Sequence, residues 1–214
     1  MDGSRYIAVE GVLGVGKTSL CEQLAKAFNA RLVLEATEEN PFLEKFYKDM
    51  RGNAFPAQIF FLLSRYRQQM EIAQGDLFRR NLICDYLFAK DRIFAYLNLE
   101  ENELNLYERL CGLLREQVVK PDLVIYLQAS TEVLQQRLGK RGRVFEKGLH
   151  RDYLERLNQA YNYYFFHYQE TPLLVVNTND IDFVHSAEDL QDLIAYIRTM
   201  GKGTQYYKPS GHEG

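Results

Sequence analysis

Excess positive charge and long apolar runs are both missing from this chain of 214 residues, which also contains no tryptophan. The formal net charge is -3, and no long run of lysine and arginine offers the positive surface that DNA or RNA binding requires. No uncharged apolar stretch reaches the roughly 18 residues of a membrane-spanning helix. We therefore expect neither a nucleic-acid partner nor a membrane partner.

Cysteine is also scarce, with three residues, Cys21, Cys84 and Cys111, far apart in the sequence. None has a second cysteine or a histidine at zinc-site spacing, so we interpret them as reduced core residues. The first five residues contain no apolar signal segment. These features predict a cytoplasmic protein. With 46% hydrophobic residues, a chain of this length is expected to form one domain over residues 1–200.

The most informative segment present is the glycine-rich run GVLGVGKT, residues 11–18. It lies between an apolar run that predicts a strand, residues 6–9, and a periodic pattern that predicts a helix, residues 17–28. Such a turn leaves backbone N–H groups free to bind phosphate, while Lys17 supplies positive charge and Thr18 a hydroxyl ligand for Mg²⁺. The last two glycines lack a Cβ that would block the ligand's approach. We predict a nucleotide-binding phosphate loop formed by Gly11, Gly14, Val15, Gly16, Lys17, Thr18 and Ser19.

Strand and helix patterns alternate along the rest of the chain. The further strands are expected at residues 31–34, 82–84, 123–127 and 173–176. The further helices are expected to begin at Asn40-Pro41 and at Ser186, and to span residues 54–75, 88–97, 101–118, 131–140 and 151–169. This alternation predicts an α/β fold with a five-stranded parallel sheet flanked by helices. The polar, glycine-rich residues 201–214 predict a mobile tail.

Two acids follow predicted strands and should face the same edge of the sheet as the phosphate loop. Glu35 ends the second strand and is a candidate general base near a hydroxyl acceptor, although a solvated carboxylate would give the same pattern. Asp85 closes the third strand, where an acid could hold Mg²⁺ or, alternatively, cap the following helix. The residues alone leave both pairs of alternatives open.

Arg137 to Arg143 concentrate four cations within seven residues beside two glycines. We interpret this segment as a basic lid loop whose arginines stabilise the charge on a transferred phosphoryl group. A solvated basic face at a helix end is the alternative. Farther on, an aromatic stripe at helical spacing is typical of core or of a subunit interface. It comprises Tyr161, Tyr164, Phe165 and Tyr168.

Taken together, these segments resemble the deoxynucleoside kinase family from Tyr6 to about Thr199. The resemblance implies the fold of P-loop nucleoside and nucleotide kinases, and ATP and Mg²⁺ as cofactors. It also implies a homodimer that phosphorylates the 5'-hydroxyl of a small-molecule deoxynucleoside. Glu35 resembles the family's general base.

The same resemblance assigns roles to residues in the middle of the chain. Tyr47 and Glu146 match the residues that contact the sugar 3'-hydroxyl. Gln58, Arg65 and Asp91 match the residues that read the nucleobase, and purines are weakly favoured. The lid arginines follow the same pattern, with Arg137 near the ATP adenine and Arg141 and Arg143 on the phosphates.

One position departs from the family pattern. Many members carry an acid followed by arginine after the third strand, whereas this chain has Asp85-Tyr86. The missing arginine makes Arg141 and Arg143 more important for meeting the charge of the transferred group.

Two alternative functions stay open at this point. A nucleoside monophosphate kinase, like thymidylate kinase, shares the loop and the fold, but its anionic acceptor needs arginines and no base. Residues 35–39 carry three acids and no cation, which would repel a monophosphate. The second alternative is a nucleotide-binding protein without catalysis.

Overall fold

One parallel sheet organises the molecule. The computed structural model describes residues 5–75, 81–142, 149–179, 181–184 and 186–209. Within them the strand order is β2-β3-β1-β4-β5-β6, and every neighbouring pair is parallel. The strands are β1 (Tyr6–Gly11), β2 (Arg31–Val33), β3 (Leu82–Cys84), β4 (Leu123–Gln128), β5 (Leu173–Asn177) and β6 (Thr204–Tyr206).

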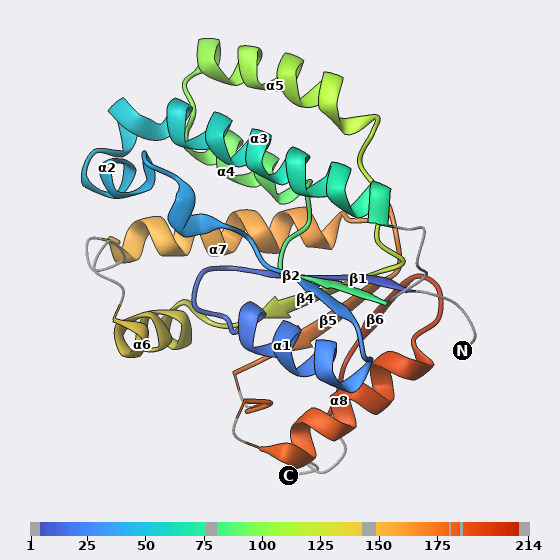
Figure 1. Ribbon diagram of the computed structural model, residues 1–214. Helices are drawn as coiled ribbons and strands as arrows, with labels where there is room; N and C mark the ends of the chain where they lie inside the picture. Colours follow the sequence, from blue (N-terminus) through green and yellow to red (C-terminus); the bar gives the residue numbers. More distant parts are fainter. Residues whose placement is uncertain (1–4, 76–80, 143–148, 180, 185, 210–214) are drawn as a thin grey trace.

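Helices cover both faces of this sheet (Figure 1). Helices α1 (Lys17–Ala27) and α8 (Ala187–Thr199) lie on one side. The other side carries α3 (Met50–Gly75), α4 (Lys90–Asn98) and α7 (Arg151–Phe166), with α5 (Glu101–Arg115) outermost. The two short helices α2 (Leu43–Lys48) and α6 (Thr131–Arg141) complete the fold. Among the described residues, no helix is both long enough and apolar enough to cross a membrane.

The central strands are buried along nearly their whole length, and are mostly apolar, because both of their faces are covered. β1 is buried at all six positions, and β4 at its first five. Such continuous apolar runs are typical of strands in a doubly covered parallel sheet. The register pairs Ala8 with Cys84 and Gly11 with Leu127, so the carboxyl ends of β1, β3 and β4 lie along one edge. Ligands of open α/β sheets bind at this edge.

The sheet has six strands, so the prediction of five was wrong. β6 pairs with β5 in the register Leu173 to Thr204, within residues 201–214, for which no strand was predicted. Tyr207 is buried and its backbone N–H donates to the carbonyl of Val175, which ties the strand down. β2 and β3 are equally short but fall in apolar runs, whereas the three residues of β6, Thr204, Gln205 and Tyr206, do not form such a run, so no strand was predicted there.

Helix α2 begins at Leu43 rather than directly after Asn40-Pro41. The Asn40 side chain accepts a hydrogen bond from the N–H of Phe42 (3.0 Å), but the N-cap residue of α2 is Phe42, and no side chain caps this helix. The Asn40 side chain also donates to the carbonyl of Ala57 (3.0 Å), which ties it to α3. The polar residue at this position therefore stabilises a turn and a tertiary contact, and the helix starts later.

The aromatic stripe of α7 belongs to the core. Tyr161, Phe165 and Tyr168 are buried, and Phe165 stacks on Tyr126 of β4 with ring centroids 4.1 Å apart. The prediction of core or interface is thus resolved in favour of core. This removes the stripe as an argument for a homodimer.

Candidate active site

The phosphate loop connects β1 to the first residue of α1. Gly14 and Gly16 have φ angles of 82° and 105°, in the left-handed region that side chains with a Cβ rarely adopt. A Cβ on Gly14 would lie 2.9 Å from Cγ of Leu138, and one on Gly16 would lie 3.2 Å from the ring of Phe183. Glycine is therefore required here by backbone conformation and by packing against α6 and the segment after β5. Access for the ligand, the reason expected from the sequence, is therefore only part of the explanation.

Lys17 lies at the junction of the loop and α1. Its Nζ donates to the carbonyl of Gly11 (2.7 Å) and to that of Val12 (3.2 Å). Burial lowers the pKa of the Lys17 ammonium, and the nearby Lys90 ammonium lowers it further. A phosphate anion bound in the loop would favour the charged form of this side chain.

The predicted nucleotide-binding residues gather around one wide cavity at this edge of the sheet. It has a volume of about 660 Å³. The cavity is lined by Gly14, Gly16, Lys17, Thr18, Ser19, Asp85, Arg137 and Arg141, with the acidic turn 35–39 opposite. Of the other predicted contacts, Gly11 ends β1 and the Val15 side chain is buried, so they could reach a ligand through the backbone alone.

The two lid arginines that the structure describes differ in their surroundings. Arg137 is held in place: its guanidinium donates to the carbonyl of Val15 (3.3 Å) and to the hydroxyl and carbonyl of Thr178 (2.9 and 2.6 Å). Arg141 is the last residue of α6 and is exposed at the cavity wall. The predicted lid residues Arg143 and Glu146 lie outside the described residues.

Thr18 and Asp85 meet as the metal prediction requires. The Thr18 hydroxyl donates to Asp85 Oδ2 (3.0 Å), and Asp85 Oδ1 accepts the backbone N–H of Glu35 (2.7 Å). Asp85 does not cap the following helix, because α4 begins only at Lys90. Within the described residues, no group of three or more His, Cys, Asp or Glu side chains could hold a metal by itself. A hydroxyl and a carboxylate suit Mg²⁺, which binds few protein ligands and completes its shell with phosphate and water oxygens.

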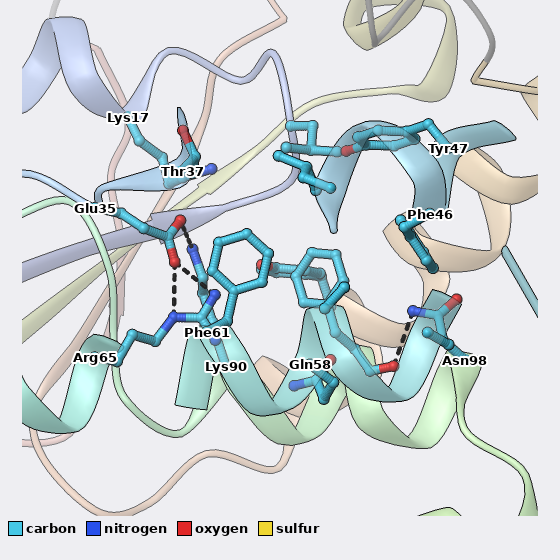
Figure 2. Close-up of a pocket in the computed structure, with 16 residues that line it drawn as sticks. Lys17, Glu35, Thr37, Phe46, Tyr47, Gln58, Phe61, Arg65, Lys90 and Asn98 are labelled. Carbon is cyan, nitrogen blue, oxygen red and sulfur yellow. Dashed lines mark hydrogen bonds and ion pairs between the residues drawn. The ribbon is translucent and has the colours of Figure 1, made fainter. Parts of the chain in front are cut away.

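Glu35 follows β2 and points inward. Its Oε1 accepts from Nε of Arg65 (2.7 Å) and its Oε2 from Nζ of Lys90 (2.8 Å), as Figure 2 shows. The side chain is 12% exposed, which rules out a carboxylate in bulk solvent. Burial opposes ionisation, but Arg65 and Lys90 overcome it and lower the pKa of Glu35 from 4.5 to about 2. The carboxylate is therefore ionised at neutral pH.

This carboxylate is the middle member of a chain of five charges of alternating sign. Arg65 also contacts Asp91, which is fully buried, and Lys90 also lies 3.6 Å from Oε1 of Glu10. The Glu10 carboxylate in turn accepts the backbone N–H groups of Gly11 and Leu87. We call Glu10, Lys90, Glu35, Arg65 and Asp91 the buried ion network.

A second, narrower cavity of about 80 Å³, which we call the inner cavity, adjoins the first and lies between α2, α3 and α4. Gln58, Phe61 and Arg65 line it from one face of α3, since residues three or four apart share a helix face. Tyr47 of α2 also lines it, as do several apolar side chains. Asp91 lies behind this wall: it pairs with Arg65, and its backbone carbonyl accepts from the Gln58 amide (2.8 Å).

The two cavities share part of their walls. Leu13, Lys17, Glu35 and Thr37 line both. A ligand in the inner cavity and a phosphate chain on the loop would therefore meet beside Glu35 and Lys17. This arrangement suits transfer of a group between two bound molecules.

Sequence reasoning missed Glu10 and Lys90, although each breaks a local rule. Glu10 is a charged residue within an otherwise apolar strand. Lys90 is the first residue of α4, where the helix dipole disfavours a cation. Such violations of local preference are expected at functional sites. Phe61 and Phe94, which also line the inner cavity, carried no signal beyond ordinary helical hydrophobicity.

A phosphate loop at the edge of a helix-covered parallel sheet, with the acids Glu35 and Asp85 beside it, defines a P-loop phosphotransferase. The comparison with known families is more specific. The family model described as deoxynucleoside kinase matches residues 7–201 of this chain, and the chain belongs to this family. The predicted family and fold are thus confirmed.

Individual relatives agree with this assignment. A deoxyguanosine kinase of Bacillus subtilis (strain 168) is 34% identical over 205 residues, which cover 94% of this chain and 99% of the relative. A deoxyadenosine/deoxycytidine kinase of the same organism is 28% identical over 202 residues, covering 91% and 92%. The structure of deoxyadenosine kinase from M. mycoides with bound dATP has a TM-score of 0.80 and 26% identity, covering 91% of this chain and 99% of that one.

Proposed function

We propose that this protein transfers the γ-phosphoryl group of ATP to the 5'-hydroxyl of a deoxynucleoside, with Mg²⁺ as cofactor and purines favoured. The main support is the wall that the two cavities share, because Glu35 and Lys17 line both of them. The deoxynucleoside would occupy the inner cavity and ATP the outer one.

Each side chain has a role in this reaction. The Glu35 carboxylate accepts a hydrogen bond from the 5'-hydroxyl and takes its proton as the new P–O bond forms. Lys17 stabilises the charge on the phosphoryl oxygens from the loop side, and Arg141 and Arg143 do so from the lid. Thr18 and Asp85 would hold Mg²⁺, which neutralises charge on the phosphate oxygens when bound.

The inner cavity suits a neutral acceptor better than a phosphorylated one. Two of its cations, Arg65 and Lys90, already pair with carboxylates of the buried ion network. That network holds three acids and two bases, so its formal charge is -1, and Lys17, the third cation that lines the cavity, brings the sum to zero, which gives a monophosphate no net attraction. This balance of charge favours a nucleoside kinase over a nucleoside monophosphate kinase.

The proposed substrate class rests on the inner wall and on the relatives. Gln58 presents an amide, which can act as both donor and acceptor toward the edge of a nucleobase. Arg65 would contact the base or orient the side chains beside it, and its ion pair with Asp91 would hold it in place. Tyr47 and Glu146 would contact the sugar. The relative that is 34% identical is named a deoxyguanosine kinase, which supports a preference for purines, whereas the relative that is 28% identical is named for a purine and a pyrimidine deoxynucleoside.

The test is a phosphorylation panel with ATP and Mg²⁺, offering the four deoxynucleosides and their four monophosphates separately. We expect the purine deoxynucleosides to give monophosphates and the monophosphates to be left unchanged. Activity confined to the monophosphates would overturn the proposal in favour of the rival kinase. Tight ATP binding with no product from any acceptor would favour the non-catalytic alternative.

We also propose a cytoplasmic homodimer. The three cysteines are free and buried, which suits a reducing compartment. Helix α5 carries exposed Leu106, Leu110 and Leu113 at spacings of four and three residues, and so presents an apolar stripe on the outermost helix. A second copy of the chain would cover this stripe.

A further inference from the structure

The residue in place of the family's arginine cannot supply its charge. Tyr86 follows Asp85 directly, but its side chain is 0% exposed and belongs to the hydrophobic core. Among the described residues that line the two cavities, Tyr86 does not occur. The charge therefore has to come from another cation on the acceptor side, where Arg65 and Lys90 both contact Glu35.

Lys90 provides one four residues farther along the chain. Its Nζ lies in the wall of the inner cavity, 2.8 Å from Oε2 of Glu35 (Figure 2). It also lies 3.6 Å from Oε1 of Glu10. Burial favours the neutral amine, but Glu10 and Glu35 together raise the pKa of Lys90 above its ordinary value. The side chain is therefore a buried ammonium.

The position of Lys90 is unfavourable for folding. It is the first residue of α4, where the partial positive charge of the helix end repels a cation. Removing an ammonium from water is also expensive unless acids surround it, and two buried acids do so here. A charge placed against both local preferences is expected to serve the site rather than stability.

We propose that Lys90 is a catalytic residue that replaces the missing arginine on the acceptor side. This inference rests on the proposed function. The bond between the γ-phosphorus and the leaving oxygen of ADP breaks, the bond to the 5'-oxygen forms, and the hydroxyl proton passes to Glu35. Lys90, which is hydrogen-bonded to the Glu35 carboxylate, faces the 5'-oxygen and the transferred phosphoryl group. Lys17 faces the phosphoryl group from the side of the phosphate loop.

The test compares three lysine variants with the wild type in the presence of ATP, Mg²⁺ and the best deoxynucleoside of the panel. Lys90→Gln keeps a hydrogen-bond donor to Glu35 but removes the charge. Lys90→Arg keeps the charge. Lys26→Gln, on the exposed face of α1, is the matched control for loss of a lysine. For each variant kcat, nucleoside affinity and melting temperature are measured.

We expect Lys90→Gln to lower kcat about 10²- to 10³-fold, the usual effect of removing one preorganised charge-stabilising group. Its nucleoside affinity should change less than about fivefold, because the lost interaction acts in the transition state. Lys90→Arg should stay within about tenfold of wild-type kcat, since the charge that catalysis requires is kept. The control should match the wild type.

Two outcomes overturn the proposal: a folded Lys90→Gln variant with wild-type kcat, or a folded Lys90→Arg variant that is as slow as Lys90→Gln. If Lys90→Gln does not fold, Lys90→Arg decides alone, with near-wild-type kcat in support and at least a hundredfold loss against. A wild type that phosphorylates no deoxynucleoside refutes the proposed function instead, so the two failures are distinguishable.

Discussion

Replacement of Glu35 by glutamine tests the centre of the proposed mechanism. The change keeps the size and polarity of the side chain but removes the charge that Arg65 and Lys90 face. Loss of a positioned base is expected to lower kcat by about 10²- to 10⁴-fold. Nucleoside binding should survive, because Gln58, Phe61 and the other walls of the inner cavity are unchanged.

The same substitution has a calculable effect on stability. Because the folded pKa of Glu35 is about 2 and the ordinary value is 4.5, ionised Glu35 contributes roughly 3 kcal/mol to the free energy of unfolding at neutral pH. The folded pKa is the lower of the two, so this stability is present above pH 4.5 and is lost as the pH falls toward 2. Between pH 5 and pH 3 the loss is about 2 kcal/mol.

Three measurements check this prediction. Coupled-enzyme kinetics give kcat, calorimetry gives nucleoside affinity, and urea denaturation at pH 5, 4 and 3 gives the free energy of unfolding. The difference between wild type and Glu35→Gln should shrink by about 2 kcal/mol over this pH range. Glu44→Gln, which removes an exposed acid paired with Lys48, is the control for a lost carboxylate. Wild-type kcat in Glu35→Gln would refute the role of the carboxylate, and a pH-independent difference in stability would refute its low pKa.

Three further predictions concern the lid, the phosphate loop and the surface. Arg141→Ala, and likewise Arg143→Ala, should lower kcat by at least tenfold with little change in nucleoside affinity; unchanged steady-state kinetics in both would remove the lid from the mechanism. Gly14→Ala should lose about 1–3 kcal/mol of stability in urea denaturation and bind ATP weakly, because its φ is 82° and the new Cβ would meet Leu138; a fully stable variant with normal ATP binding would contradict this. Leu113→Glu, at a side chain 73% exposed on α5, should halve the mass measured by light scattering; a wild type that is already monomeric would contradict the dimer.

Most of the fold could be predicted from the sequence because its signals are local. The apolar runs of β1, β3 and β4 were found within two residues of their true ends, since a strand buried on both faces is continuously apolar. β6 was missed because its pairing is set by β5 and by the burial of Tyr207, and neither is visible in a run of three residues.

Some residues of the candidate site could likewise be predicted from the sequence, and others are brought together only by the packing of the helices. The phosphate loop and the strand-end acids follow from spacing, because the carboxyl ends of parallel strands share one edge of the sheet. The partners of Glu35 do not follow from spacing. Arg65 comes from α3 and Lys90 from α4, and only the packing of these helices brings them to Glu35. The burial of Asp91 behind Arg65 likewise depends on tertiary structure.

A base with a pKa of about 2 is weak, and the chemistry of phosphoryl transfer explains why it suffices. In a loose transition state the bond to the incoming oxygen is little formed, so the hydroxyl becomes acidic only late in the reaction. Glu35 then acts first by orienting the hydroxyl, and its ion pairs with Arg65 and Lys90 fix that orientation.

Position should therefore matter as much as basicity at this carboxylate. Glu35→Asp keeps a carboxylate but withdraws it by one methylene, and a misplacement of about 1 Å can lower the rate roughly 10²-fold. We expect kcat of Glu35→Asp to lie within about tenfold of that of Glu35→Gln in the same assay. A nearly active aspartate variant would show instead that proton acceptance, rather than orientation, limits the reaction.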